Sequence, residues 1–170
     1  YQNRLCTADD AVQAIHSHDR VFMTGNCSVP KELLAALVRR GPQLEAVEII
    51  QVLTIGPAEY VAPEMAGHIR VHSLFISHTV RKAVNEGRAD FTPIFLSQIP
   101  QAMRDPGLLK PRVAMIHCSP PDEHGYCTFG VEVGLTKPAA EAADIVIAEV
   151  NDRMPRSLGD SFIHVNRLTH

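Results

Sequence analysis

The sequence lacks the features that mark several common classes of protein. Lys and Arg number 16 against 19 Asp and Glu, so there is no basic surplus for binding DNA, RNA or an anionic membrane. No apolar run approaches the roughly 20 residues that span a bilayer. The start, Tyr1-Gln2-Asn3-Arg4, has neither an initiator Met nor a signal-peptide core, and we expect the natural protein to begin upstream. We expect no nucleic-acid partner and no membrane partner.

Paired cysteines are also lacking. The four cysteines, Cys6, Cys27, Cys118 and Cys127, form no Cys-x-x-Cys pair. A disulfide scaffold is usually shorter and denser in cysteine, so these residues indicate reduced thiols in a cytosol-like compartment. We therefore expect a cytoplasmic protein whose cysteines pack as small apolar residues.

Nucleotide-binding signatures are missing as well. The sequence has no Gly-x4-Gly-Lys-Ser/Thr, and no Gly-x-Gly-x-x-Gly follows an expected strand. The segment 24–29 could direct backbone N–H groups at an anion, but an ordinary helix start is the favoured interpretation. A standard nucleotide-binding domain is disfavoured.

The composition is that of a folded domain. The chain has 170 residues and a mass of 18.7 kDa, with 45% hydrophobic and 21% charged residues. A chain of this length buries roughly 70% of its unfolded surface on folding. We expect residues 1–170 to form a single domain with its own core.

Short runs rich in Val and Ile alternate with helical patterns. Strands are expected near 19–24, 47–53, 69–75, 90–95, 112–118 and 144–150. Helical patterns lie near 7–15, 28–38, 79–87, 98–103 and 136–143, and a polar loop follows Cys118. Nearly continuous apolar strands separated by helices predict an α/β fold with a mostly parallel sheet and helices on both faces.

In such sheets, ligands bind beyond the carboxyl ends of the strands. The loops expected there are 24–27, 54–57, 76–78 and 119–121.

The remaining chemical candidates do not select a reaction. The spacing of Cys118, His124 and Cys127, with His117 beside them, matches no common zinc site. A thiol activated by His124 has no evident third group. Carboxylates at strand ends or in loops could act as acid, base or acyl acceptor, although solvated surface charge is the default interpretation; they are Glu59, Glu64, Asp122, Glu123, Glu132 and Asp160. From the residues alone, the chain is an α/β domain with a cleft at its strand ends.

Several long motifs resemble one family. Ser119-Pro-Pro-Asp-Glu-His-Gly-Tyr-Cys-Thr-Phe-Gly130, Ile147–Arg156 and Gly159–His164 are similar to signatures of the acetyl-CoA hydrolase/transferase family, in particular its 4-hydroxybutyrate CoA-transferase branch. Further motifs follow the same order upstream: Gly56–Tyr60, Thr79–Ala83, Asn85–Ala89 and Asp90–Pro93. The resemblance covers nearly the whole chain.

The resemblance implies a CoA-transferase-like α/β domain of the NagB/RpiA type, the N-terminal half of a two-domain enzyme. Such enzymes move coenzyme A between an acyl-CoA and a carboxylate through an acyl-glutamyl anhydride and a glutamyl-CoA thioester. Coenzyme A is then a substrate, and no cofactor is held permanently. The family's catalytic glutamate lies in the C-terminal domain, which is absent from this chain. The resemblance therefore implies no catalytic side chain here and no activity of the chain alone.

The resemblance also implies which loops form one wall of the active site. Backbone N–H groups of Thr54, Ile55 and Gly56 are expected near the thioester oxygen. The loop Gly25-Asn26-Cys27 is expected to shape the carboxylate pocket, and Ser77-His78 to form a further wall. Many relatives are glycine-rich where this chain has Asn26-Cys27, so the size of the pocket is open.

Two other functions, and association into a homo-oligomer, remain open. The chain could be a non-catalytic domain that binds acyl-CoA or a carboxylate, or a complete sugar-phosphate isomerase or hydrolase. Apolar surface left uncovered by a second domain would favour a homo-oligomer.

Overall fold

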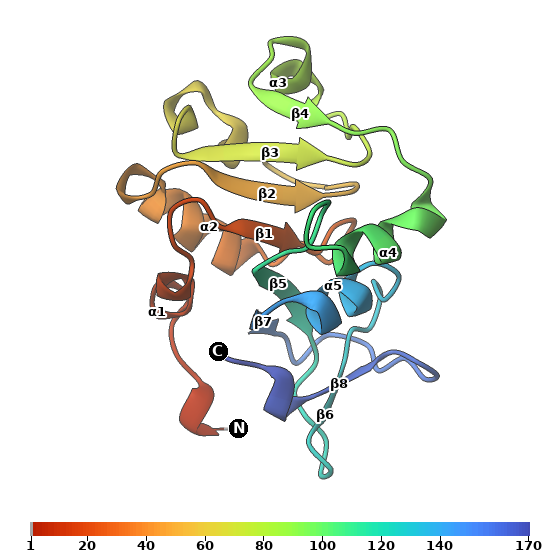
Figure 1. The fold of residues 1–170 in the computed structure, drawn as a ribbon. Helices are drawn as coiled ribbons and strands as arrows, with labels where there is room; N and C mark the ends of the chain where they lie inside the picture. Colours follow the sequence, from red (N-terminus) through yellow and green to blue (C-terminus); the bar gives the residue numbers. More distant parts are fainter. Residues whose placement is uncertain (1) are drawn as a thin grey trace.

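A six-stranded parallel sheet forms the centre of the computed structural model, which describes residues 2–170 (Figure 1). The strand order is β4-β3-β2-β1-β5-β7. The strands are β1 (Arg20–Met23), β2 (Val47–Gln51), β3 (Ile69–Ser73), β4 (Ala89–Phe91), β5 (Val113–Cys118) and β7 (Ile145–Val150). The α/β class and the parallel sheet expected from the sequence are confirmed.

Helices cover both faces of this sheet. They are α1 (Ala8–Ala11), α2 (Lys31–Arg40), α3 (Arg81–Asn85), α4 (Ile99–Arg104) and α5 (Thr136–Ala142). Val21 and Met23 of β1 pack in the same core as Leu37 of α2. Phe22, between them, packs with Met103 of α4 on the opposite face. Alternate residues of a strand point to opposite faces, and both are buried here, which explains the continuous apolar runs.

The two N-terminal helices begin in different ways. The hydroxyl of Thr7 accepts a hydrogen bond from Asp10 N at 3.1 Å, the N-cap that the sequence predicts for α1. At the start of α2, the carboxylate of Glu149 accepts from the backbone N–H groups of Glu32 (2.9 Å) and Leu33 (3.1 Å). Glu149 lies on β7, so tertiary structure supplies the cap that local sequence does not.

The expected polar loop after Cys118 contains a strand that sequence analysis missed. β6 (Tyr126–Thr128) pairs antiparallel with β8 (Phe162–His164) in a separate two-stranded sheet. Each strand has three residues, too few for an alternating pattern to appear, and the pairing joins segments far apart in the chain. The third and fourth strands also end early, at Ser73 and Phe91.

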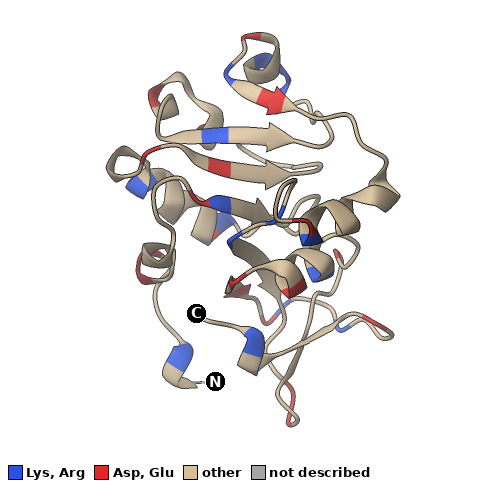
Figure 2. Cartoon of the chain, viewed as in Figure 1, with Lys and Arg blue, Asp and Glu red and all other residues tan. Residues whose placement is uncertain are grey.

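On the face of the six-stranded sheet that α4 covers, one part carries charged side chains and, within residues 2–170, no helix. Arg20, Glu48 and Arg70 lie in register on β1 to β3, and Asp90 of β4 lies opposite His72 on the same face, so the charges alternate in sign from strand to strand (Figure 2). Arg20 pairs with Glu48 and Arg70 with Asp90, each at 2.5 Å. Cross-strand pairs of opposite charge stabilise this solvent-facing surface.

No helix within residues 2–170 has the length and apolar character needed to cross a membrane.

Replacing Leu37 with Ala should lower the free energy of unfolding by about 3 kcal/mol, because its fully buried side chain would leave a cavity in the α2 core. The matched control is Leu158→Ala, since Leu158 is 85% exposed; its cost should stay within about 0.5 kcal/mol. Denaturant unfolding of both variants measures the difference, and equal losses would contradict this packing.

Candidate functional site

The six strands are parallel, so their carboxyl ends lie along one edge of the sheet, and the strand order reverses between β1 and β5. From β1 the chain builds β2, β3 and β4 on one side, whereas β5 and β7 lie on the other. Open α/β sheets bind ligands in the crevice at such a switch point. The loops after β1, β2 and β3 lie at this edge, which is where the sequence placed the candidate site.

The loop after β1 is held tightly against the segment that follows β2. Asn26 N donates to Leu53 O at 2.5 Å, and Asn26 forms an isolated parallel bridge with Thr54. A Cβ atom on Gly25 would lie far inside contact distance of the Leu53 carbonyl oxygen. Asn26 has φ +53°, a left-handed conformation that Asn tolerates better than most residues. The structure thus brings Gly25 and Asn26 together with Thr54.

Buried hydroxyl groups support the loops after β2 and β3. The Thr54 and Ser77 hydroxyls lie 3.3 Å apart, and Ser77 contacts the Thr79 hydroxyl at 2.8 Å. Tyr60 donates to Gln51 Oε1 at 2.8 Å, and its hydroxyl lies 3.3 Å from that of Thr54. Burial raises the pKa of Tyr60, which favours its neutral, donating form. The Thr54 and Ser77 side chains are therefore engaged internally.

Gly56 offers a backbone donor at the same edge. Its φ is +123°, and its N–H has no hydrogen-bond acceptor within residues 2–170. The neighbouring Ile55 side chain is 54% exposed. A backbone N–H without an acceptor, next to an exposed residue, is the kind of group that can stabilise a developing oxyanion.

A pocket of about 340 Å³ opens between these loops and the segment before α5. This volume is at the small end of the range for ligand sites. Its apolar walls are Phe22, Val52, Leu53, Phe75, Leu96 and Leu135. Gly25, Asn26, Glu132 and Thr136 also line it. We refer to it below as the strand-end pocket.

Not every residue expected at the site reaches this pocket. Cys27 and His78 are exposed at the same edge and do not line it. Phe75 and Leu96 do line it, although the sequence gave them no role, and so does Glu132, which the sequence offered only as one of six carboxylates able to act as acid, base or acyl acceptor. Phe75 was assigned to a strand, and Glu132 lies at the far end of the polar loop expected after Cys118, so only the folded chain places them here.

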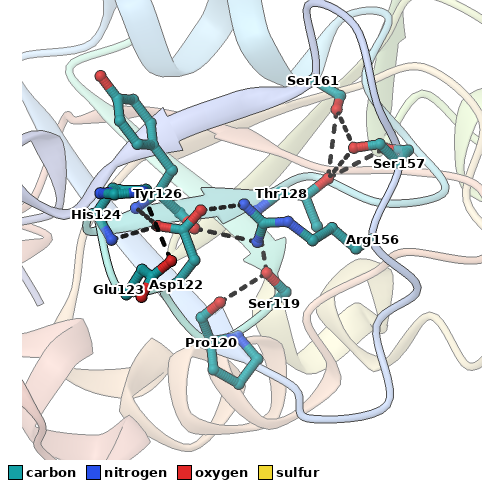
Figure 3. A network of polar contacts seen from close by, with 10 residues as sticks. All are labelled: Ser119, Pro120, Asp122, Glu123, His124, Tyr126, Thr128, Arg156, Ser157 and Ser161. Atoms are coloured by element: carbon teal, nitrogen blue, oxygen red, sulfur yellow. Dashed lines mark hydrogen bonds and ion pairs between the residues drawn. The ribbon is translucent and has the colours of Figure 1, made fainter.

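The Ser119–Gly130 motif forms a polar network away from this pocket (Figure 3). One Asp122 oxygen accepts from the backbone N–H groups of His124 (3.0 Å) and Tyr126 (2.8 Å), and the other pairs with Arg156. The Tyr126 N–H is the largest cause that holds the pKa of Asp122 below its usual range. Asp122 therefore stays ionised and ties the turn before β6 to the segment before β8.

The cysteine and histidine candidates do not form a reactive pair. Cys118 and Cys127 are buried, whereas the His124 side chain is 76% exposed. A hydrogen bond to Cys127 and then burial raise the pKa of Cys118, so this thiol is held protonated. Within residues 2–170, no three His, Cys, Asp or Glu side chains gather as a metal site would require.

A second histidine has a more ordered environment. His72 Nδ1 lies 2.7 Å from Glu48 Oε1, and its Nε2 lies 2.7 Å from the Thr92 hydroxyl. A hydroxyl (Thr92), an imidazole (His72) and a carboxylate (Glu48) linked in this order by hydrogen bonds resemble a catalytic triad. These side chains belong to the charged face of β1 to β4, however, and Glu48 also pairs with Arg20, so cross-strand pairing accounts for them.

Comparison with known proteins shows the family. The whole chain, residues 1–170, matches the model of the acetyl-CoA hydrolase/transferase N-terminal domain. The chain belongs to this family. The resemblance seen in the sequence motifs is thereby confirmed.

Several members of the family are close in sequence. The chain is 44% identical over 170 residues to a 4-hydroxybutyrate coenzyme A transferase of Clostridium kluyveri, covering all of this chain and 39% of the relative. It is 38% identical over 151 residues to a succinyl-CoA:acetate/propanoyl-CoA:succinate CoA transferase of Fasciola hepatica, covering 88% of this chain and 31% of that one. The chain thus spans less than two fifths of the length of these relatives.

A solved structure shows the same fold. The crystal structure of a 4-hydroxybutyrate CoA-transferase from Porphyromonas gingivalis matches with a TM-score of 0.82 and 32% identity, over all of this chain and 39% of that one. The six-stranded sheet is therefore the fold of this family's N-terminal part.

Replacing Gly25 with Ala should lower the free energy of unfolding by about 2 kcal/mol, because the new methyl group overlaps the Leu53 carbonyl oxygen and the backbone must move. Gly107→Ala is the control, since the nearest atom to its added Cβ is a side-chain oxygen at 3.4 Å. Thermal unfolding of the two variants compares them. A Gly25→Ala variant as stable as the control would show that the two loops are not held in contact.

In the folded chain, a maleimide should label Cys6 and Cys27 and spare Cys118 and Cys127, because the first pair is exposed and the second buried. The labelling rate of Cys6 should still climb above pH 9, since burial and the nearby Asp10 raise its pKa. Peptide mass spectrometry at several pH values follows each thiol, and unfolded chain serves as the fully labelled control. Rapid labelling of Cys127 before unfolding would contradict the packing of β6.

Proposed function

We propose that this chain is the N-terminal domain of an acyl-CoA:carboxylate CoA-transferase of the acetyl-CoA/4-hydroxybutyrate type. The observation that carries the proposal is the strand-end pocket on a chain that belongs to the family, together with a backbone donor, Gly56 N–H, that follows the lining residue Leu53 and has no acceptor within residues 2–170. The partners are an acyl-CoA and a short carboxylate. Coenzyme A is a substrate, and no permanent cofactor is required.

The proposed reaction uses a glutamate that lies outside residues 1–170. Its carboxylate attacks the thioester carbonyl, the C–S bond breaks, and CoA leaves as a thiolate. The thiolate attacks the glutamyl carbonyl of the resulting anhydride and releases the original acyl group as a carboxylate. The acceptor carboxylate then attacks the glutamyl-CoA thioester, and the released thiolate takes the new acyl group from the second anhydride. Splitting the exchange in this way replaces one difficult step with several easier ones.

In this scheme, the present chain supplies one wall. A negative oxygen develops at each carbonyl under attack, and the Gly56 N–H is available to donate to it. Because this donor is held by the left-handed turn after Thr54, it needs little rearrangement when the charge forms. The pocket between Gly25, Asn26 and Leu53 receives the short chain of the acyl group or the acceptor.

A second domain is supported by the exposed apolar side chains at this edge. Ile55 is 54%, Phe75 57%, Phe95 76% and Leu96 64% exposed. Phe75 and Leu96 line the strand-end pocket, and exposed apolar side chains around a pocket are typical of a surface that another domain covers. The same edge could instead pair two copies of the chain, which is the homo-oligomer that the sequence suggested.

The experiment compares CoA transfer from acetyl-CoA to short carboxylates by residues 1–170 and by the longer protein that contains them. We expect transfer by the longer protein alone, with the ping-pong kinetics of a covalent intermediate. A longer variant with Gly56 replaced by Pro should lose at least about tenfold in kcat, because Pro has no N–H and its fixed φ cannot keep the +123° turn that holds this donor.

Other outcomes would favour the alternatives. Turnover by residues 1–170 alone would indicate a complete single-domain enzyme. Binding of acyl-CoA or carboxylate by the longer protein without turnover would indicate a binding or assembly domain.

A further inference from the structure

The strand-end pocket contains one charged side chain. Among the residues that line it, Glu132 is the one with a charged side chain, a carboxylate, and the others are apolar or uncharged. Glu132 lies in the segment between β6 and α5 and is partly buried. A single anionic group in an otherwise apolar pocket strongly affects which chains can enter.

Asn26 holds this carboxylate in place. Asn26 Nδ2 donates to Glu132 Oε2 across the pocket, from a residue 106 positions away in the chain. The Asn26 backbone is itself held by its bond to Leu53 O and by the left-handed turn. The amide and the carboxylate therefore form a fixed polar pair on a pocket wall whose other members are mostly apolar.

No cation among residues 2–170 neutralises the pair. Within residues 2–170, no Lys, Arg or His nitrogen lies within 4.0 Å of the Glu132 carboxylate. Asn26 occupies Oε2, and Oε1 has no hydrogen-bond donor among the same residues. A carboxylate in this condition accepts a hydrogen bond from a hydroxyl group readily and repels a second carboxylate.

We propose that the Asn26–Glu132 pair determines acyl specificity in this protein: it favours a short acyl chain that carries a hydroxyl group and excludes one that carries a second carboxylate. The inference rests on the proposed function and deepens it. The hydroxyl would donate to Glu132 while the methylene groups contact the apolar walls. A site that hydrogen-bonds a substrate hydroxyl discriminates against the chain that lacks it, because its polar group is then left unpaired.

The test uses competition between acceptors in the longer protein, with acetyl-CoA as the donor. Butyrate, 4-hydroxybutyrate and succinate are supplied together, and the ratio of the three acyl-CoA products is measured. Glu132→Gln removes the charge at constant size and can still accept from Asn26. The control is Glu64→Gln, the same change at an exposed position outside the pocket.

With Glu132→Gln, we expect the ratio of succinyl to butyryl product to rise about tenfold and the ratio of hydroxybutyryl to butyryl product to fall about tenfold. The rate with butyrate should change less than about threefold. Glu64→Gln should leave all three ratios unchanged. If Glu132→Gln fails to fold, Glu132→Ser removes the charge with a smaller side chain, and the same shifts are expected.

Three results would overturn the inference. Unchanged product ratios in an active Glu132 variant would show that the pair does not select the chain, while the proposed function would stand. Loss of transfer to every acceptor, with unaltered thermal unfolding, would place Glu132 at the reacting centre rather than in specificity. Absence of transfer by the unaltered longer protein would overturn the proposed function, and this inference with it.

Discussion

The site depends on one close approach of two backbone segments. Asn26 N reaches Leu53 O at 2.5 Å only because Gly25 has no Cβ atom to meet that oxygen. This contact joins the loops after β1 and β2 at the edge formed by the carboxyl ends of the strands. The strand-end pocket and the orientation of the Asn26 side chain both follow from it, and a rigid support of this kind is what a binding site needs.

The polar groups around this contact have different roles. The hydroxyls of Thr54, Tyr60 and Ser77 are used internally and stabilise the loops, whereas the Gly56 N–H has no acceptor in the part of the chain that the structure describes. The charged side chains of β1 to β4 pair with one another on a separate, solvent-facing surface. Glu132 differs from both groups because it lies in the pocket with no cation from residues 2–170 beside it, which is why we assign it to the substrate.

Much of the fold was predictable from local pattern. A buried parallel strand requires a continuous apolar run, and the runs in the sequence marked all six strands of the sheet, although β3 and β4 end earlier than expected. The short strands β6 and β8 were not predictable, because three residues carry no period and their pairing is a long-range contact. The cap of α2 was missed for the same reason, since its carboxylate comes from β7.

The sequence by itself determined the fold class, the family and the edge of the sheet at which chemistry is expected, because each is written in local apolar pattern and continuous motifs. Only the tertiary structure decided which side chains share the pocket. It brought Glu132 to Asn26 across 106 residues, placed Phe75 and Leu96 on the walls, and left Cys27 and His78 facing solvent. Such pairings depend on how helices and strands pack, and spacing along the chain carries no record of distances between segments that meet only when the chain folds.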